Sequence, residues 1–167
     1  SFADSLVGFM RGGLSVVSVM AGMFFAAISG SGAATTAAVG SSLVPELKRK
    51  GYDPASAASL IAASGTIGVV IPPSVPMIIY AVIAQQSVSK LFLNGFLPGL
   101  AMGLGLMAIA IAQAYKRQYP KGTPLSLTTI WNTFKDASWG LMTPVIILGG
   151  IFSGIFTPSE AAVVAVN

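Results

Sequence analysis

The feature that most constrains this chain is a pair of helix-breaking, hydroxyl-rich segments inside stretches otherwise apolar enough for a lipid bilayer. The first segment is Ile28 to Thr36 (ISGSGAATT), and the second is Thr66 to Pro76 (TIGVVIPPSVP). Each unpaired backbone N–H or C=O in hydrocarbon costs several kcal/mol, so irregular backbone at membrane depth persists only against protein or a water-filled cavity. Paired breaks of this kind are typical of binding sites in secondary transporters.

The composition places the chain in a membrane. Of its 167 residues, 54% are hydrophobic and 8% are charged, whereas about 25% of residues are charged in a typical soluble domain. The chain has no Cys and no His, which excludes disulfides, thiolate or imidazole metal ligands and a histidine proton relay. We therefore expect a multi-pass integral membrane protein that is not an enzyme and needs no cofactor. The net charge of +4 comes from clusters beside apolar segments, which predicts membrane orientation and not nucleic-acid binding.

Residues 13–52 are predicted to form a re-entrant helical hairpin. The apolar first arm has only about 15 residues, roughly 22 Å of helix, which is too short for a full span. Gly30 suits the end of this arm, and Ser31 suits the cap of a second, more polar arm. Such a hairpin leaves Arg11 and the cluster Lys48–Lys50 on one side of the membrane, as the cytoplasmic bias of basic residues prefers.

Residues 53–86 are predicted to form a discontinuous transmembrane helix. Asp53 and Pro54 suit the cap and the first turn of its first half. The helix is expected to loosen from Gly68 to Pro73 and to restart after Ser74, because proline lacks the amide hydrogen that continues a helix. The interruption is expected near the middle of the membrane.

The rest of the chain adds further helices to an expected all-α integral membrane fold. Residues 90–117 are predicted to be a continuous transmembrane helix, whose basic end at Lys116 and Arg117 returns to the side of Lys48–Lys50. Interfacial amphipathic helices are expected at 1–12 and 124–139, and a further transmembrane segment with a break near residue 156 at 140–167.

The two breaks offer oxygen atoms and helix ends to ligands. Hydroxyls, turn carbonyls and carbonyls freed by proline suit a cation such as sodium, and helix N-termini suit a substrate carboxylate. The residues predicted to bind sodium are Ser29, Gly30, Ser31, Ser64, Thr66, Gly68 and Pro72. Those predicted to bind substrate are Gly32, Thr35, Thr36, Pro73 and Ser74. The structural alternative is a tight capped turn and a simple proline kink.

Two other motifs favour structural roles. Gly95, Gly99 and Gly103 recur every fourth residue, which predicts close helix packing. Glu160 follows Thr157 with the spacing of a capping box, so its carboxylate is expected to cap a helix rather than bind a ligand.

Several stretches resemble the large membrane subunit of tripartite ATP-independent periplasmic (TRAP) transporters. They are the string FFAAISGSGAATTAAVG at 24–40, GYD at 51–53, GTIGVVIPPSVP at 65–76 and ILGGIFSGIFTPSEA at 147–161. The resemblance covers essentially the whole chain, in order. It implies a sodium-driven importer of organic acids in the bacterial inner membrane, with an elevator-type transport domain built from inverted repeats. It also implies two partners, a small membrane subunit and a periplasmic binding protein that delivers the substrate.

The resemblance also indicates a subtype and a fragment. Thr35 and Thr36 stand where members resembling sialic-acid transporters carry an alanine-aspartate pair, so the chain looks closer to the dicarboxylate type. Ala33 stands where some dicarboxylate relatives carry proline. The family's second hairpin and its partner helix are missing from a sequence that stops at Asn167, so we expect a piece of a longer protein.

Two alternatives to transport by this route remain open at the level of sequence. One is a non-transporting membrane subunit, in which the glycine stripe serves helix association and the prolines only bend helices. The other is a channel, which is disfavoured because no ring of charged or carbonyl filter residues is evident.

Overall fold

The computed structural model describes residues 11–119, 142–143 and 145–153. This part is built of helices and contains no strand, which confirms the predicted all-α class. The helices are α2 (Gly13–Ser29), α3 (Gly32–Arg49), α4 (Pro54–Thr66), the 3-10 helix η1 (Ile67–Val69), α5 (Val75–Ile83) and α6 (Val88–Lys116). Residues 142–143 and 145–152 are also helical.

Three sequence predictions fall on other residues. The interfacial helices at 1–12 (apart from residues 11 and 12) and 124–139, and the break near residue 156 with its capping box, lie outside the described residues.

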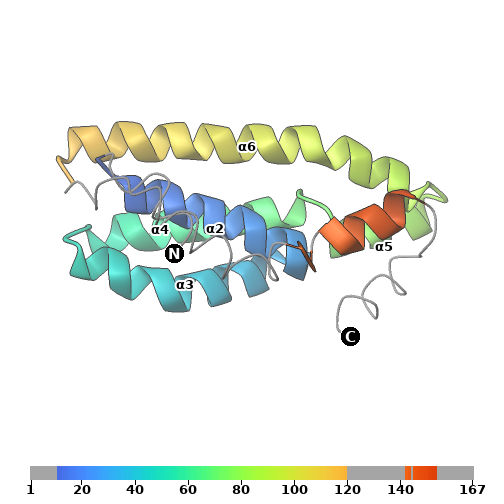
Figure 1. The fold of residues 1–167 in the computed structure, drawn as a ribbon, viewed down its shortest axis with the longest axis horizontal. Coiled ribbons are helices and arrows are strands. Elements are labelled where there is room, and N and C mark those ends of the chain that lie inside the picture. The colour runs from blue at the N-terminus through green and yellow to red at the C-terminus, as the bar shows by residue number, and fades with distance from the viewer. Residues whose placement is uncertain (1–10, 120–141, 144, 154–167) are drawn as a thin grey trace.

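The helices form two layers along one long axis (Figure 1). Helix α6 runs the length of the molecule, and α2, α3 and α4 lie beneath one half of it. Helices α2 and α3 form an antiparallel hairpin, and α4 packs against both of its arms. Helix α5 lies beyond the hairpin tip and packs against the other half of α6.

Local sequence chemistry sets the turns between these helices. Gly30 ends α2 in the left-handed conformation, with φ 61°, and donates its amide hydrogen to the carbonyl of Ala26 at 2.9 Å. The side chain of Ser31 then caps α3. Asp53 caps α4 by accepting the amide of Ser56 at 2.9 Å. These caps confirm the helix ends predicted at Gly30, Ser31 and Asp53.

Glycines let the hairpin approach α4 and η1 closely. A Cβ built on Gly22 would lie 2.8 Å from the Ser64 hydroxyl, and one on Gly65 would lie 1.7 Å from the Thr36 hydroxyl. A Cβ on Gly32 would lie 2.9 Å from the Gly65 carbonyl oxygen. Small residues therefore hold both hairpin arms against the broken helix, as close packing in membranes generally requires.

The glycine stripe of α6 serves the packing role predicted for it. Gly95, Gly99 and Gly103 are buried. A Cβ on Gly103 would lie 2.4 Å from the sulfur of Met23 in α2, and one on Gly99 would lie 2.7 Å from the Ile71 side chain. The stripe thus seats α6 against both the hairpin and the second break.

Among the described helices, α6 is the one long and apolar enough to cross a membrane: it has 29 residues, and an 18-residue window within it has a mean hydropathy of 1.9. It is about 43 Å long at 1.5 Å per residue. Helix α2 and the stretch from α4 through η1 are apolar but shorter. The break contacts α6 at Gly99, about 25 Å from the C-terminal end of that helix. The break therefore lies well inside the length that α6 covers.

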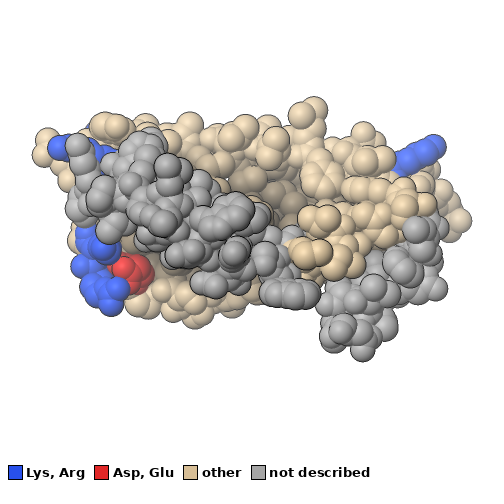
Figure 2. Space-filling model, viewed as in Figure 1, with Lys and Arg blue, Asp and Glu red and all other residues tan. Residues whose placement is uncertain are grey.

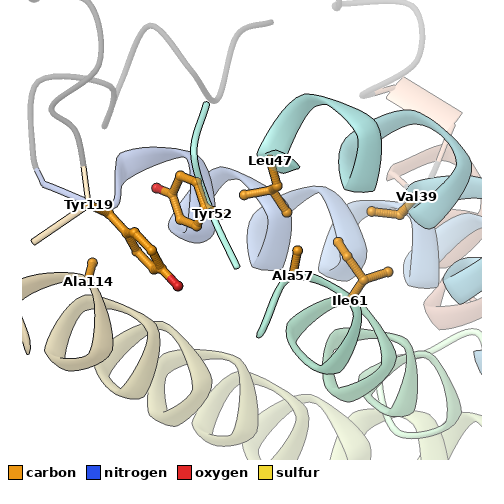
Figure 3. Close-up of a cluster of buried hydrophobic side chains, with 7 residues drawn as sticks. All are labelled: Val39, Leu47, Tyr52, Ala57, Ile61, Ala114 and Tyr119. Carbon is orange, nitrogen blue, oxygen red and sulfur yellow. The ribbon is translucent and has the colours of Figure 1, made fainter. Parts of the chain in front are cut away.

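Basic side chains gather at one end of the molecule, where α3 and α6 end (Figure 2). Asp53 and Arg117 form an ion pair of 3.4 Å there, and the rings of Tyr52 and Tyr119 stack with centroids 4.1 Å apart. Figure 3 shows these tyrosines in the hydrophobic cluster that joins the α3–α4 loop to α6. The clusters at Lys48–Lys50 and at the end of α6 thus share one end of the molecule, as the sequence predicted.

Candidate functional site

The two broken segments touch. The amide of Val75, the first residue of α5, donates a 3.1 Å hydrogen bond to the carbonyl of Gly30 at the hairpin tip. A Cβ built on Gly30 would lie 2.6 Å from the carbonyl oxygen of Pro73. This contact confirms the prediction that the two breaks meet.

Four helix ends converge at this contact. Helix α2 ends at Ser29 and η1 ends at Val69, whereas α3 and α5 begin directly after Ser31 and Ser74. The C-terminal ends carry partial negative charge and the N-terminal ends partial positive charge. The junction therefore presents both signs of helix dipole without any charged side chain.

A hydroxyl pair lies directly behind the hairpin tip. The hydroxyls of Ser29 and Thr35 are 2.9 Å apart, and either can donate to the other. The Ser29 hydroxyl also lies 3.2 Å from the carbonyl oxygen of Ser31. Thr35 is completely buried, and a Cβ on Gly68 would lie 2.9 Å from its hydroxyl oxygen. Thr35, predicted to bind substrate, thus lies inside the junction rather than on an open surface.

Prolines interrupt the second segment, and a serine partly repairs it. Pro72 and Pro73 have no amide hydrogen to continue the helix toward the carbonyls of Gly68 and Val69. The Ser74 hydroxyl donates a 2.6 Å hydrogen bond to the Val69 carbonyl and also caps α5. The bond between Pro72 and Pro73 is cis. Pro72 cannot donate to the Gly68 carbonyl, and no serine hydroxyl among the described residues takes its place.

The structure does not bring every predicted sodium residue to the tip. Ser64 is buried against Gly22 of α2 and donates its hydroxyl to the carbonyl of Ile61 within its own helix. Thr66 is exposed and donates to Ala63. Residues two apart on a helix point in nearly opposite directions, so Ser64 packs against the α2 arm whereas Thr66 lies on the side of α4 that borders the α3 arm.

Gly32, Thr36 and Thr66 instead line an open pocket between α3 and α4, of about 580 Å³. The Thr36 hydroxyl donates to the Gly32 carbonyl at 2.9 Å, which leaves its oxygen able to accept a further hydrogen bond. The pocket lies beside the first turn of α3, whose leading amides have no partner within the helix. Such a surface suits an anionic group better than a cation.

The donor atoms of the site are neutral oxygens and backbone amides. Within the described ranges no three His, Cys, Asp or Glu side chains come together as a metal site would require. Hydroxyl and carbonyl oxygens suit a hard monovalent cation, and helix N-termini suit a carboxylate. The arrangement is one for binding, and it offers no nucleophile paired with a base.

Sequence reasoning missed three contributors to this site. The Val75 amide was not predicted to contact the tip, and Gly22 and Gly65 were not predicted to seat the hairpin on α4. Pro76 one residue after Val75 indicated the start of a helix, whose first amides are always available as donors. No local signal in the sequence identified the partners of the two glycines.

Comparisons with known proteins identify the family of this chain. The family described as Tripartite ATP-independent periplasmic transporter, DctM component, matches residues 1–167. The chain is 47% identical, over 98% of its length, to the C4-dicarboxylate TRAP transporter large permease protein DctM of Pseudomonas aeruginosa. It is 47% identical over 99% of its length to the isethionate TRAP transporter permease protein DctMQ of Oleidesulfovibrio alaskensis. It is 41% identical over 99% of its length to the sialic acid TRAP transporter permease protein SiaT of Haemophilus influenzae.

The chain spans 38%, 26% and 27% of the lengths of these three relatives, respectively. The family is a transporter permease and not an enzyme, as the sequence predicted, and it is a family of membrane proteins. The chain belongs to the DctM component family of tripartite ATP-independent periplasmic transporters.

Proposed function

We propose that this chain is part of the transmembrane subunit of a sodium-coupled secondary transporter that imports organic acids of the C4-dicarboxylate kind. The observation that carries the proposal is the contact between Gly30 and the start of α5, where four helix ends converge. Broken helices whose ends meet inside a membrane are the usual way in which transporters bind an ion and its substrate.

Sodium binds at the C-terminal ends of α2 and η1. Four oxygen atoms of the junction are the candidate ligands. They are the Ser29 hydroxyl, the turn carbonyls of Gly30 and Ser31, and the Gly68 carbonyl, which Pro72 leaves without a donor. Ser64 and Thr66 belong to the predicted sodium set, but their hydroxyls bond within α4 and to no residue of the hairpin turn. Their contribution is therefore expected to be smaller than that of Ser29.

The substrate carboxylate binds at the N-terminal side of the junction. Gly32, Thr36 and the start of α3 border the open pocket, and Ser74 begins α5 across the junction. The name of the Pseudomonas relative specifies C4-dicarboxylate, and those of the other two specify isethionate and sialic acid. All three named substrates are organic anions. The names therefore support an organic-anion substrate for this chain more strongly than they support any single acid.

The complete protein works in the bacterial inner membrane with a small membrane subunit and a periplasmic binding protein. The word tripartite in the family description supports two further components. In this arrangement residues 13–52 form a re-entrant hairpin within an elevator-type transport domain, and the second half of the site comes from sequence beyond this chain. The runner-up, a non-transporting helix-association subunit, fits the glycine packing but not membership of a transporter family.

The test is uptake by the complete transporter, reconstituted with its partners, as a function of sodium concentration. Ser29→Ala is expected to raise the sodium concentration for half-maximal uptake roughly tenfold, because a charge-assisted oxygen contact contributes about 1.5–3 kcal/mol. Ser41→Ala is the matched control, since the Ser41 hydroxyl is exposed on α3 and bonds to the Ala38 carbonyl within that helix. Equal sodium dependence in both variants would remove Ser29 from the ion site.

The same assay distinguishes the runner-up. Uptake of any organic acid that follows the sodium gradient and needs the binding protein supports transport. A complete protein that assembles with its partners but takes up no organic acid, at any sodium gradient, would favour the structural subunit instead.

A further inference from the structure

An open pocket of about 720 Å³ lies at the basic end of the molecule, remote from the junction of the breaks. The last turn of α3, with Lys48, and the α3–α4 loop, with Tyr52 and Asp53, form one wall, and Arg117 and Tyr119, which directly follow α6, form the other. The stacked tyrosines close its inner side, because both are more than 90% buried. The pocket therefore joins a charged rim to an aromatic floor.

The charges around this pocket do not cancel. Each nearby carboxylate already has a cationic partner: Glu46 pairs with Arg49, and Asp53 pairs with Arg117. In the described part of the chain, Lys48, Lys50 and Lys116 have no ion-pair partner. The surplus at this end of the molecule is thus positive and is carried by lysines. Figure 2 shows most of the visible basic side chains here, with a further one at the opposite end.

The helix that leads to Arg117 exposes apolar side chains in its last two turns. Tyr115 is 56% exposed and Ile109 is 64% exposed on the same end of that helix. An apolar helix surface followed by basic side chains and tyrosines is typical of a segment at the membrane–water interface. A ligand with a phosphate group and a hydrocarbon tail would match both parts of this surface.

We propose that this pocket binds the phosphate headgroup of an anionic phospholipid from the surrounding bilayer. Lys48 is the principal cation, because no carboxylate among the described residues pairs with it, and Arg117 is the second. The acyl chains lie along the exposed face of α6. Asp53 faces the same pocket, and its charge is offset by Arg117 and by the Ser56 amide. This site is independent of the sodium coupling proposed above.

The test is native mass spectrometry of the complete transporter with its partners, released from micelles that contain phosphatidylglycerol or phosphatidylcholine. The wild type is expected to retain phosphatidylglycerol in preference to phosphatidylcholine. Lys48→Gln is expected to lower phosphatidylglycerol retention about fivefold, the effect of losing one lysine near an anionic lipid surface. Lys48→Arg should restore it.

Lys90→Gln is the matched control, because Lys90 lies in the first turn of α6, at the opposite end of that helix. Loss of retention in Lys48→Gln but not in Lys90→Gln supports the site. Equal retention in the two variants would overturn it, as would equal retention of the two lipids by the wild type. Displacement of the lipid by millimolar inorganic phosphate would also overturn it, since the pocket would then be a site for free phosphate.

Discussion

The amide of Val75 lies 3.1 Å from the carbonyl oxygen of Gly30, so the first turn of α5 and the hairpin tip form one hydrogen-bonded unit. The bond satisfies a helix-start amide and a turn carbonyl at once, and both groups would otherwise need water or another partner. The hairpin tip is therefore held by a residue of α5 as well as by contacts within the hairpin. Changes at Gly30 should affect α5 as well as the turn.

Gly30→Ala is expected to destabilise the complete transporter by about 1–3 kcal/mol and to abolish most uptake. The residue has φ 61°, which an L side chain adopts at a cost, and its new Cβ would lie 2.6 Å from the Pro73 carbonyl oxygen. Thermal unfolding of the purified complex and uptake in proteoliposomes measure the two effects.

Gly51→Ala separates backbone strain from the contact. Gly51 has φ 83°, but a Cβ there would meet nothing within 4 Å. Gly51→Ala should therefore lower the free energy of unfolding only by the backbone strain, about 1 kcal/mol, and should leave uptake unchanged. If Gly30→Ala lowered the unfolding temperature and uptake no more than Gly51→Ala, the close approach of Gly30 to Pro73 would be contradicted.

Gly99→Ala is expected to loosen α6 from the second break. Its Cβ would lie 2.7 Å from the Ile71 side chain and 3.5 Å from the Ile71 backbone, so the helices must separate. Gly105→Ala on the same helix would meet nothing within 4 Å and should be neutral or slightly stabilising, because alanine favours a helix over glycine. A lower unfolding temperature for Gly105→Ala than for Gly99→Ala would contradict the packing described here.

Local chemistry explains why so many helix ends were predictable. Serine and aspartate commonly cap helix N-termini, as Ser31 and Asp53 do here, and proline commonly follows such a cap. Glycine commonly ends a helix, as Gly30 does. The prolines at Pro72 and Pro73 remove amide hydrogens wherever they occur. These effects act within one turn of the chain, so sequence alone was sufficient for them.

The side of a helix that carries a contact was less predictable. Ser64 and Thr66 were grouped as sodium ligands, yet one is buried against Gly22 and the other is exposed. Which arm of the hairpin each of them meets depends on the rotation of α4, and in this rotation Gly65 packs against Thr36 of α3. Such contacts join residues far apart in the sequence, where local pattern carries no information.

Tyr52→Phe and Tyr119→Phe should differ although the two rings stack. Burial raises the pKa of Tyr52 above its usual 10.0, and a hydrogen bond with Ser15 opposes that rise. Removing this hydroxyl should cost about 1 kcal/mol, because Ser15 is buried and loses a partner. The Tyr119 hydroxyl is buried with no hydrogen-bond partner among the described residues, so its removal should be neutral or stabilising. Unfolding temperatures of the two variants test this, and a larger loss for Tyr119→Phe would contradict it.

Asp53 should make the basic end of the molecule sensitive to acid. The Ser56 backbone amide, and to a lesser degree Arg117, hold the pKa of this carboxyl below its usual 3.8. A carboxyl whose pKa is lowered by folding contributes stability that is complete above the unfolded value and is lost as pH falls through the folded one. The contribution is therefore complete well above pH 3.8 and is lost as pH falls from about that value through the lower pKa of the folded state. Asp53→Asn retains a good helix cap but cannot titrate, so its unfolding temperature should fall less than that of the wild type between pH 5 and pH 3, on the order of a degree or two. If the unfolding temperatures of the two proteins fell equally over this pH range, Ser56 and Arg117 would not stabilise the Asp53 carboxylate in the folded state.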